Sequence, residues 1–158
     1  MGVLTPGVGS AGPFQSLRQA TLPASQYGSS GASDSYPLDF DLPHGLTVGL
    51  LLPYTIQFSA SAASSRYAEV AMSIGIAGEG DKALTTALVK RLVELAQAIG
   101  VPQNFREMRI EEGQFLTKVE VVSEYVLKAG PTVFSPRVPS PDELTQLFLA
   151  AFHGDLLA

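Results

Sequence analysis

Apolar side chains recur every three or four positions along most of the chain after residue 43, the period that gathers them on one face of an α-helix. The clearest such stretch starts at Asp81, which we expect as its N-cap, and stops before Gly100 and Pro102. The opposite face of this stretch is polar and charged, so we expect Leu88 and Leu92, at the centre of the apolar stripe, to lie in the main core. The stripe consists of Leu84, Leu88, Leu92, Leu95 and Ile99.

The segment from Pro43 to about Phe58 has no charged side chain and is apolar on nearly all sides. A helix of this kind belongs at the centre of a fold, and Pro53 should bend it because proline removes one backbone hydrogen bond. A buried parallel strand is the alternative, but the length of the segment favours a helix. We expect a second helix over about residues 62–74, ended by the glycines between 75 and 80.

Two further helices are expected towards the C-terminus. One covers about residues 111–129 and stops at Gly130. The other opens with a capping box of Ser140 and Glu143 and ends at Gly154, which are signals typical of helix termini. Because the chain has five helical patterns and no alternating strand pattern, it is predicted to be all-α, a bundle of about five helices.

Residues 1–36 are rich in Gly, Ser, Ala and Pro and show no sustained apolar period. We therefore expect a disordered, low-complexity leader over 1–36, followed by a helical domain over 37–158. Within the leader, residues 7–12 match the letters of a dinucleotide-binding glycine motif. That motif needs a preceding strand and a following βαβ unit, and the sequence indicates neither, so we assign no cofactor-binding residue.

Hydrophobic residues make up 46% of the chain and charged residues 16%, with a net charge of −5. The sequence has no cluster of Lys and Arg, which argues against a nucleic-acid partner. The absence of cysteine excludes disulfides, thiolate metal sites and a Cys nucleophile. The longest uncharged apolar run is about a dozen residues, whereas a bilayer span needs roughly 20. With no secretory signal at its start, the chain is expected to be cytoplasmic and outside any membrane.

The two histidines are the candidates for metal or acid–base chemistry. His44 begins the uncharged segment, either as a helix-entry residue bonded to a nearby carbonyl or as part of a site, although one histidine alone is never a metal site. His153 is expected in the last turn of the final helix, where the helix dipole favours a cation. Asp41 and Asp155 could join both histidines in one site, but nothing in the sequence brings these four residues together, and we assign no catalytic residue.

The stretch Asp41–Leu46, continued by Leu50–Tyr54, closely resembles a segment of the iron-containing (group III) alcohol dehydrogenases. In that family the histidine of the Pro-His-Gly motif is one of the metal ligands, so the resemblance assigns this role to His44. It also implies that the chain is the distal part of the family's helical domain. Further stretches resemble the family in the same order, namely 35–38, 67–71, 92–102, 136–137 and 141–151.

Members of this family hold Fe²⁺ or Zn²⁺ with one Asp and three His, and pass a hydride between an alcohol and NAD(P). The resemblance implies that the nucleotide-binding domain, the Asp and the first His are missing here, and that Ala32 or a neighbour stands in place of another His. Arg109 stands where the family usually has glycine. The resemblance therefore implies a fragment of an NAD(P)-linked alcohol or aldehyde oxidoreductase that binds neither metal nor cofactor by itself and is inactive alone, with His44 at an open cleft.

The alternative is a non-catalytic helical module that pairs with a separate nucleotide-binding chain, or with a second copy of itself. The low share of charged residues favours such a covered surface. The two hypotheses differ in whether a neighbouring reading frame encodes the missing nucleotide motif, Asp and His.

Overall fold

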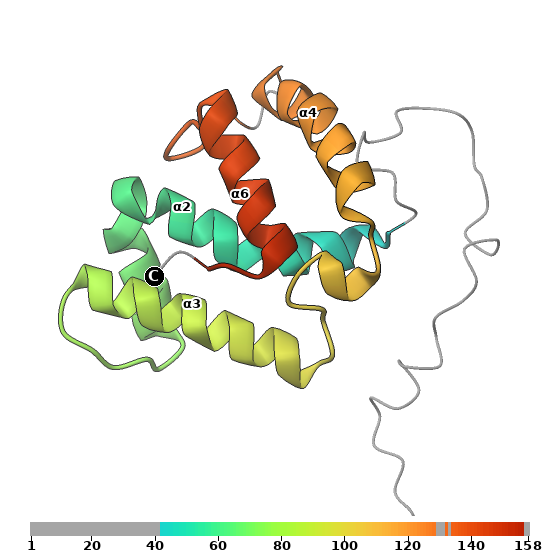
Figure 1. Cartoon of the computed structure of the whole chain (residues 1–158). Helices are drawn as coiled ribbons and strands as arrows, with labels where there is room; N and C mark the ends of the chain where they lie inside the picture. The colour runs from blue at the N-terminus through green and yellow to red at the C-terminus, as the bar shows by residue number, and fades with distance from the viewer. Residues whose placement is uncertain (1–41, 129–131, 133, 157–158) are drawn as a thin grey trace, which may run out of the picture. The chain divides into compact units, whose positions relative to one another are not determined.

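Helices account for all the regular structure in the computed structural model, which describes residues 42–128, 132 and 134–156, with the side chain of His44 excepted. The leader predicted over 1–36 lies outside these residues. The all-α prediction is confirmed for the described part of the chain. Its elements are the α-helices α2 (His44–Ser73), α3 (Asp81–Ala98), α4 (Glu112–Lys128) and α6 (Pro141–His153), with the short 3₁₀ helix η2 (Arg106–Met108) before α4 (Figure 1).

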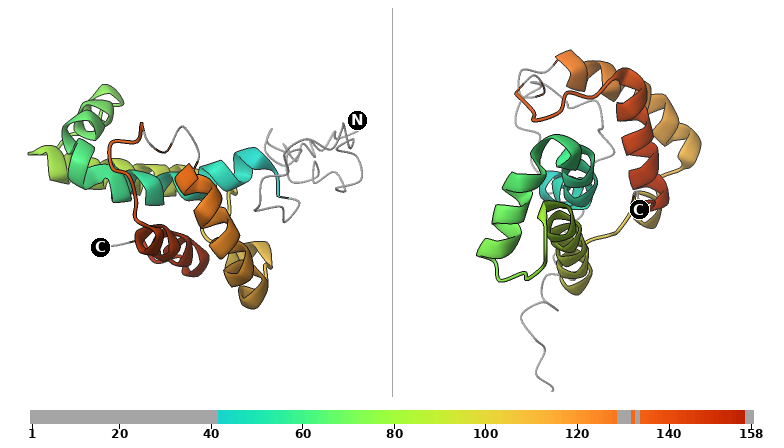
Figure 2. Two further views of the ribbon diagram at one scale, coloured as in Figure 1. Left: turned by 90° about the horizontal axis from the view of Figure 1, so that it is seen from above. Right: turned by 90° about the vertical axis from the view of Figure 1, so that its left-hand side faces the viewer.

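The long helix α2 is the element around which the others are arranged. It lies between α3 on one side and the pair α4 and α6 on the other (Figures 1 and 2). Because neighbours cover more than one side of α2, its first half needs apolar side chains in several directions. The uncharged sequence between residues 44 and 65 meets this need, and the expected central helix is confirmed.

The first two predicted helices form one continuous element with a kink. The kink lies at Ala63, whose φ of −139° and ψ of 23° leave the helical region, whereas Pro53 lies inside the helix. The backbone angles at Pro53 stay helical, and the bend expected there stays a prediction. Pro53 is buried, and residues 59–65, which surround the kink, are all Ser or Ala. Runs of such small residues are a common place for a helix to kink.

By length and composition alone, Gly45–Ser73 is long and apolar enough to cross a membrane, with a mean hydropathy of 1.2 over its most apolar window. This span is longer than the uncharged apolar run of about a dozen residues noted in the sequence, because it also takes in the Ser and Ala residues after Phe58. The core helix of a water-soluble protein passes the same test. In this fold α2 packs against α3 and α6, but only 33% of the apolar window is buried, and Val48 and Leu52 are 49% and 41% exposed.

The helix termini follow the sequence closely at α6 and less closely at α3. Ser140 Oγ accepts a hydrogen bond from the backbone N–H of Glu143 at 3.2 Å, and the Glu143 carboxylate accepts one from the backbone N–H of Ser140 at 2.9 Å. This is the predicted capping box, and Gly154 ends the helix with a φ of 88° as expected. At α3 the N-cap is Gly80, and Asp81 is the first helical residue. The predicted cap is therefore one residue too late, because the entry turn needs the positive φ that glycine adopts freely.

The largest buried side chains gather where η2, α4 and α6 meet α2. Phe115 of α4 is fully buried between Phe105 and Phe152, with ring centroids 5.0 and 4.8 Å away. Tilted aromatic contacts of this kind contribute about 0.5–1.5 kcal/mol each beyond the burial of their area. Leu50 and Tyr54 of α2 complete this main core.

A second, smaller cluster joins the far half of α2 to the start of α3. The expectation that Leu88 and Leu92 lie in the main core is wrong, because Leu88 lies in this second cluster and Leu92 is only partly buried beside it. Further along the stripe, Leu95 is 48% exposed and Ile99 is 53% exposed. The helical period identifies the apolar face of α3, but it does not tell how much of that face a neighbour covers. The second cluster consists of Ala68, Ala71, Leu84 and Leu88.

Replacing Phe115 with Ala should lower the free energy of unfolding by about 3–5 kcal/mol, the usual cost of deleting a fully buried aromatic side chain. The cost arises because the two facing rings would then border a cavity. Leu95→Ala is the matched control, since it removes an apolar side chain that is largely exposed, and it should cost less than about 1 kcal/mol. Urea unfolding followed by circular dichroism measures both values. Equal losses in the two variants would contradict the placement of the main core.

Arg109 adopts a left-handed backbone conformation directly after η2, with φ 60° and ψ 29°. No other non-glycine residue in the described part of the chain has a positive φ. A side chain in this region costs about 1–2 kcal/mol, because Cβ crowds the following carbonyl oxygen. This conformation explains why the resemblance places a glycine at this position.

Arg109→Gly should therefore raise the free energy of unfolding by up to about 1 kcal/mol, after the greater freedom of glycine in the unfolded chain is subtracted. Arg91→Gly, in the middle of α3, is the matched control and should lower it by roughly 1 kcal/mol. Urea midpoints of the two variants and the parent chain provide the comparison. Destabilisation by both substitutions would mean that position 109 is not strained.

Candidate functional site

His44, the predicted metal ligand, is the first residue of α2. The backbone N–H groups of Leu46 and Thr47 donate to the carbonyl of Pro43 at 2.9 and 3.2 Å, so residue 44 stands in the first turn of the helix. The side chain of His44 and the whole of Asp41 lie outside the described residues. The role of His44 as a ligand, and its place at an open cleft, therefore stay predictions.

The described residues do not by themselves make a donor set for a metal ion. No three side chains of His, Asp, Glu or Cys within the described ranges lie close enough together to hold one. Zinc sites that perform catalysis use about three protein ligands, as well as an open position. The joint site of two histidines and two aspartates is not tested, because two of its members lie outside the described part.

His153 lies in the last turn of α6, as expected, and its ring joins three elements. Arg106 Nη2 lies 2.8 Å from His153 Nδ1, and Glu112 Oε1 lies 3.6 Å from Nε2. A guanidinium can only donate, so Nδ1 must accept and the ring proton belongs on Nε2, towards Glu112. The ring also packs edge-on against Phe152, with centroids 5.2 Å apart. These contacts make His153 a structural link between η2, α4 and α6.

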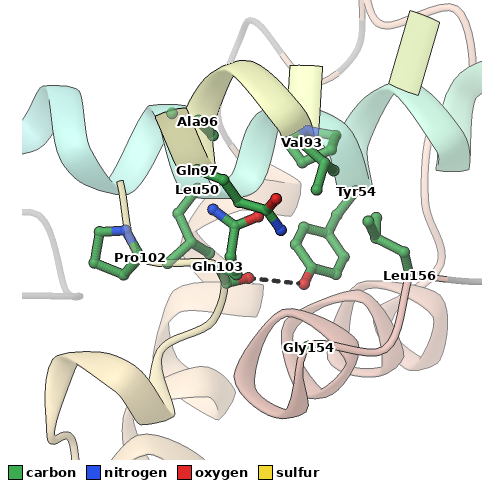
Figure 3. A pocket seen from close by; sticks show the side chains of 11 residues that line it. Leu50, Tyr54, Val93, Ala96, Gln97, Pro102, Gln103, Gly154 and Leu156 are labelled. Atoms are coloured by element: carbon green, nitrogen blue, oxygen red, sulfur yellow. Dashed lines mark hydrogen bonds between the residues drawn. The ribbon is translucent and has the colours of Figure 1, made fainter. Parts of the chain in front are cut away.

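A hollow of about 140 Å³ lies between the first half of α2, the end of α3 and the C-terminal turn (Figure 3). The Tyr54 hydroxyl donates a hydrogen bond to the backbone carbonyl of Gln103 at 3.1 Å, drawn as a dashed line in Figure 3. Apolar side chains such as Leu50, Val93 and Leu156 form much of the wall. Among the described residues no charged side chain lines this hollow, so they offer one phenol there but no acid, base or nucleophile at neutral pH.

Burial raises the pKa of Tyr54 to about 12, and the negative charges of Asp155 and Glu107 add to the shift. The phenol therefore stays neutral and remains a donor to Gln103 at any physiological pH. This hydrogen bond fixes α2 to the segment that follows α3. Sequence reasoning did not single out Tyr54, although a tyrosine within an apolar helix needs a partner for its hydroxyl, which is a usable signal.

The stability of the fold should decrease as the pH rises from about 10 towards 12. An unfolded phenol ionises near pH 10, whereas Tyr54 in the folded chain ionises near 12. Between these values the unfolded chain binds fewer protons than the folded chain, so a rise in pH favours unfolding by up to about 2–3 kcal/mol. Tyr54→Phe should remove this part of the pH dependence, and Tyr125→Phe, which alters a tyrosine that is 49% exposed, should keep it. Urea unfolding at pH 9 and pH 11 measures this change in the free energy of unfolding. If the change in Tyr54→Phe equals that in the parent chain, the assignment is refuted.

The family described as "Fe-containing alcohol dehydrogenase family, C-terminal" matches residues 35–152. The chain is similar to the NADPH-dependent butanol dehydrogenase of Clostridium saccharobutylicum, at 31% identity over 115 residues, which cover 73% of this chain and 30% of that protein. It is also 31% identical over 134 residues to the bifunctional aldehyde-alcohol dehydrogenase AdhE of Escherichia coli K12, covering 73% of this chain and 15% of that protein.

The fold is similar to the crystal structure of a 1,3-propanediol oxidoreductase, with a TM-score of 0.62 and 27% sequence identity. This likeness covers 72% of the present chain and 29% of that structure. The chain therefore spans less than a third of the length of these relatives.

Proposed function

This chain belongs to the iron-containing alcohol dehydrogenase family, and from that membership we propose that it is the metal-binding helical part of an NAD(P)-linked alcohol or aldehyde oxidoreductase. The observation that carries the proposal is the family match over residues 35–152, which includes α2, α3 and α4 and all but the last residue of α6. The names of the relatives include butanol and aldehyde-alcohol dehydrogenases. Small alcohols and aldehydes are therefore the substrates to test.

In this proposal His44 contributes one metal ligand from the first turn of α2. A neutral imidazole is a good ligand for Fe²⁺ or Zn²⁺, but one imidazole holds neither ion tightly. The whole sequence has two histidines, and His153 is engaged with Arg106 and Glu112. The further ligands and the nucleotide-binding part of the enzyme must therefore come from outside the described helices.

The 158-residue polypeptide is accordingly proposed to be inactive alone. Its helices provide a scaffold with one ligand position, and the polar contacts described above join helices to one another. Purified alone, it should show no NAD(P)-linked turnover of butan-1-ol, propane-1,3-diol or butanal with added Fe²⁺ or Zn²⁺. Turnover above the blank would overturn this part of the proposal.

A chimera tests whether these helices support catalysis. Residues 35–152 of this chain would replace the matching stretch of the butanol dehydrogenase relative, which keeps its own preceding residues. We expect NADPH-linked reduction of butanal that falls about 100-fold or more when His44 is changed to Ala, because a removed metal ligand typically costs at least as much as a disrupted neighbour of one. Glu69→Gln, on the exposed side of α2, is the matched control and should leave the rate unchanged.

The chimera also separates the two functional hypotheses. Metal content and NADPH binding are measured alongside the rate. A folded chimera that binds NADPH but neither binds metal through His44 nor turns over butanal would favour the non-catalytic helical module. Equal rates for His44→Ala and the parent chimera would remove the assignment of His44 as a ligand while leaving family membership intact.

A further inference from the structure

Arg137 makes three contacts that join separate segments of the described fold. Its Nη1 donates to the backbone carbonyl of Phe58 at 3.1 Å. Its guanidinium carbon lies 4.1 Å from the centroid of the Phe58 ring, and its Nη2 pairs with the carboxylate of Glu143. One side chain from the segment between α4 and α6 therefore contacts the backbone and ring of an α2 residue and the first turn of α6.

The carbonyl that Arg137 contacts lies about one turn before the kink of α2. In a regular helix each carbonyl accepts from the N–H four residues later, and kinks occur where a side chain reaches into this ladder. The guanidinium approaches the carbonyl of Phe58, and the backbone leaves the helical region at Ala63. The external donor and the kink thus lie next to each other along the helix.

Among the described residues, the segment between α4 and α6 leaves a hollow beside the kink, although Ala63 itself is buried. A hollow of about 350 Å³ lies between Phe134 and Pro136 on one wall and Ala62 and Ala63 on the other. The side chain of Phe134 is 88% exposed, so it does not fill this hollow. Arg137 donates a hydrogen bond from this segment to α2. This contact is therefore placed to set the kink angle of α2.

Glu143 holds the other side of Arg137. One carboxylate oxygen accepts from the backbone N–H of Ser140 at 2.9 Å, as part of the capping box, and the other receives the Arg137 guanidinium. The backbone hydrogen bond from Ser140, followed by the charge of Arg137, lowers the pKa of Glu143 below its ordinary 4.5. The carboxylate is therefore charged at neutral pH, and the rigid cap keeps it in position.

We propose that Arg137 is a clamp that fixes the kink of α2 at Ala63 and ties it to the start of α6. The first half of α2 contributes Leu50 and Tyr54 to the main core, and the second half contributes Ala68 and Ala71 to the second cluster. Because the kink separates these two halves, its angle relates the face of α2 in one cluster to the face in the other. The clamp thereby couples the final helix to the α2–α3 pair, although these elements are far apart in sequence.

Spin labels on α2 report the kink directly. The chain has no cysteine, so Thr55→Cys and Ser73→Cys, at two exposed positions on opposite sides of the kink, can be labelled without interference. The parent chain should give one narrow distance distribution by double electron–electron resonance. Arg137→Ala should broaden it and shift it towards the separation of a straight helix, roughly 27 Å between Cα atoms for 18 residues. Arg137→Lys should behave like the Ala variant, because Lys lacks the planar fork and stacks poorly.

Amide hydrogen exchange provides the second measurement. Exchange of residues 59–66 should rise about tenfold or more in Arg137→Ala, the consequence of losing a charge-assisted hydrogen bond. Arg91→Ala is the matched control, since it removes an arginine from an exposed ion pair with Glu94, and it should change neither readout. If the label distance and the exchange are both unchanged in Arg137→Ala, the small residues of α2 set the kink and the proposal is wrong.

A further variant keeps the test decisive if Arg137→Ala does not fold. Glu143→Gln retains a side-chain oxygen for the N–H of Ser140 but removes the negative charge that faces Arg137. We expect the label distance to shift in the same direction as in the Arg137 variants, with a smaller amplitude. A distance identical to that of the parent chain would overturn the role of Glu143 as the anchor of the clamp.

Discussion

The burial of Phe115 between Phe105 and Phe152 is the contact on which the described fold depends. The three rings come from three segments, the residues before η2, the first turns of α4 and the last turn of α6. Isolated helices shorter than about 12–15 residues are marginally stable in water. Because α6 has only 13 residues, it depends on tertiary packing. The aromatic cluster supplies that packing, and Leu50 and Tyr54 attach it to α2.

The second constraint is that one helix serves two clusters. α2 carries large apolar side chains where it meets the main core and small ones where it meets α3, since Ala68 and Ala71 allow a close approach to Leu84 and Leu88. A straight helix would present these two faces at fixed angles, and the kink at Ala63 gives the chain a way to adjust them. The low share of charged residues has part of its origin here, because α2 has no charged residue before Arg66.

Two groups of polar contacts in the described part of the chain hold separate elements together. Tyr54 bonds the carbonyl of Gln103, and His153 links Arg106 to Glu112. None of these groups faces a set of further donors that would bind a metal ion within the described part. Within the described helices of this member of the iron-containing alcohol dehydrogenase family, these contacts therefore have a structural role.

The sequence by itself determined the features that depend on neighbours along the chain. The capping box of Ser140 and Glu143, the stop at Gly154 and the apolar faces of the helices follow from local hydrogen bonds and periodicity. The resemblance that identified the family also rests on short local motifs, and His44 came from it rather than from periodicity. Only the tertiary structure decided that α2 bends at Ala63 and that Leu95 is exposed. It also decided which partners the side chain of His153 contacts. These outcomes depend on which distant segments cover a given face, and that information is not contained in the spacing of residues along one helix.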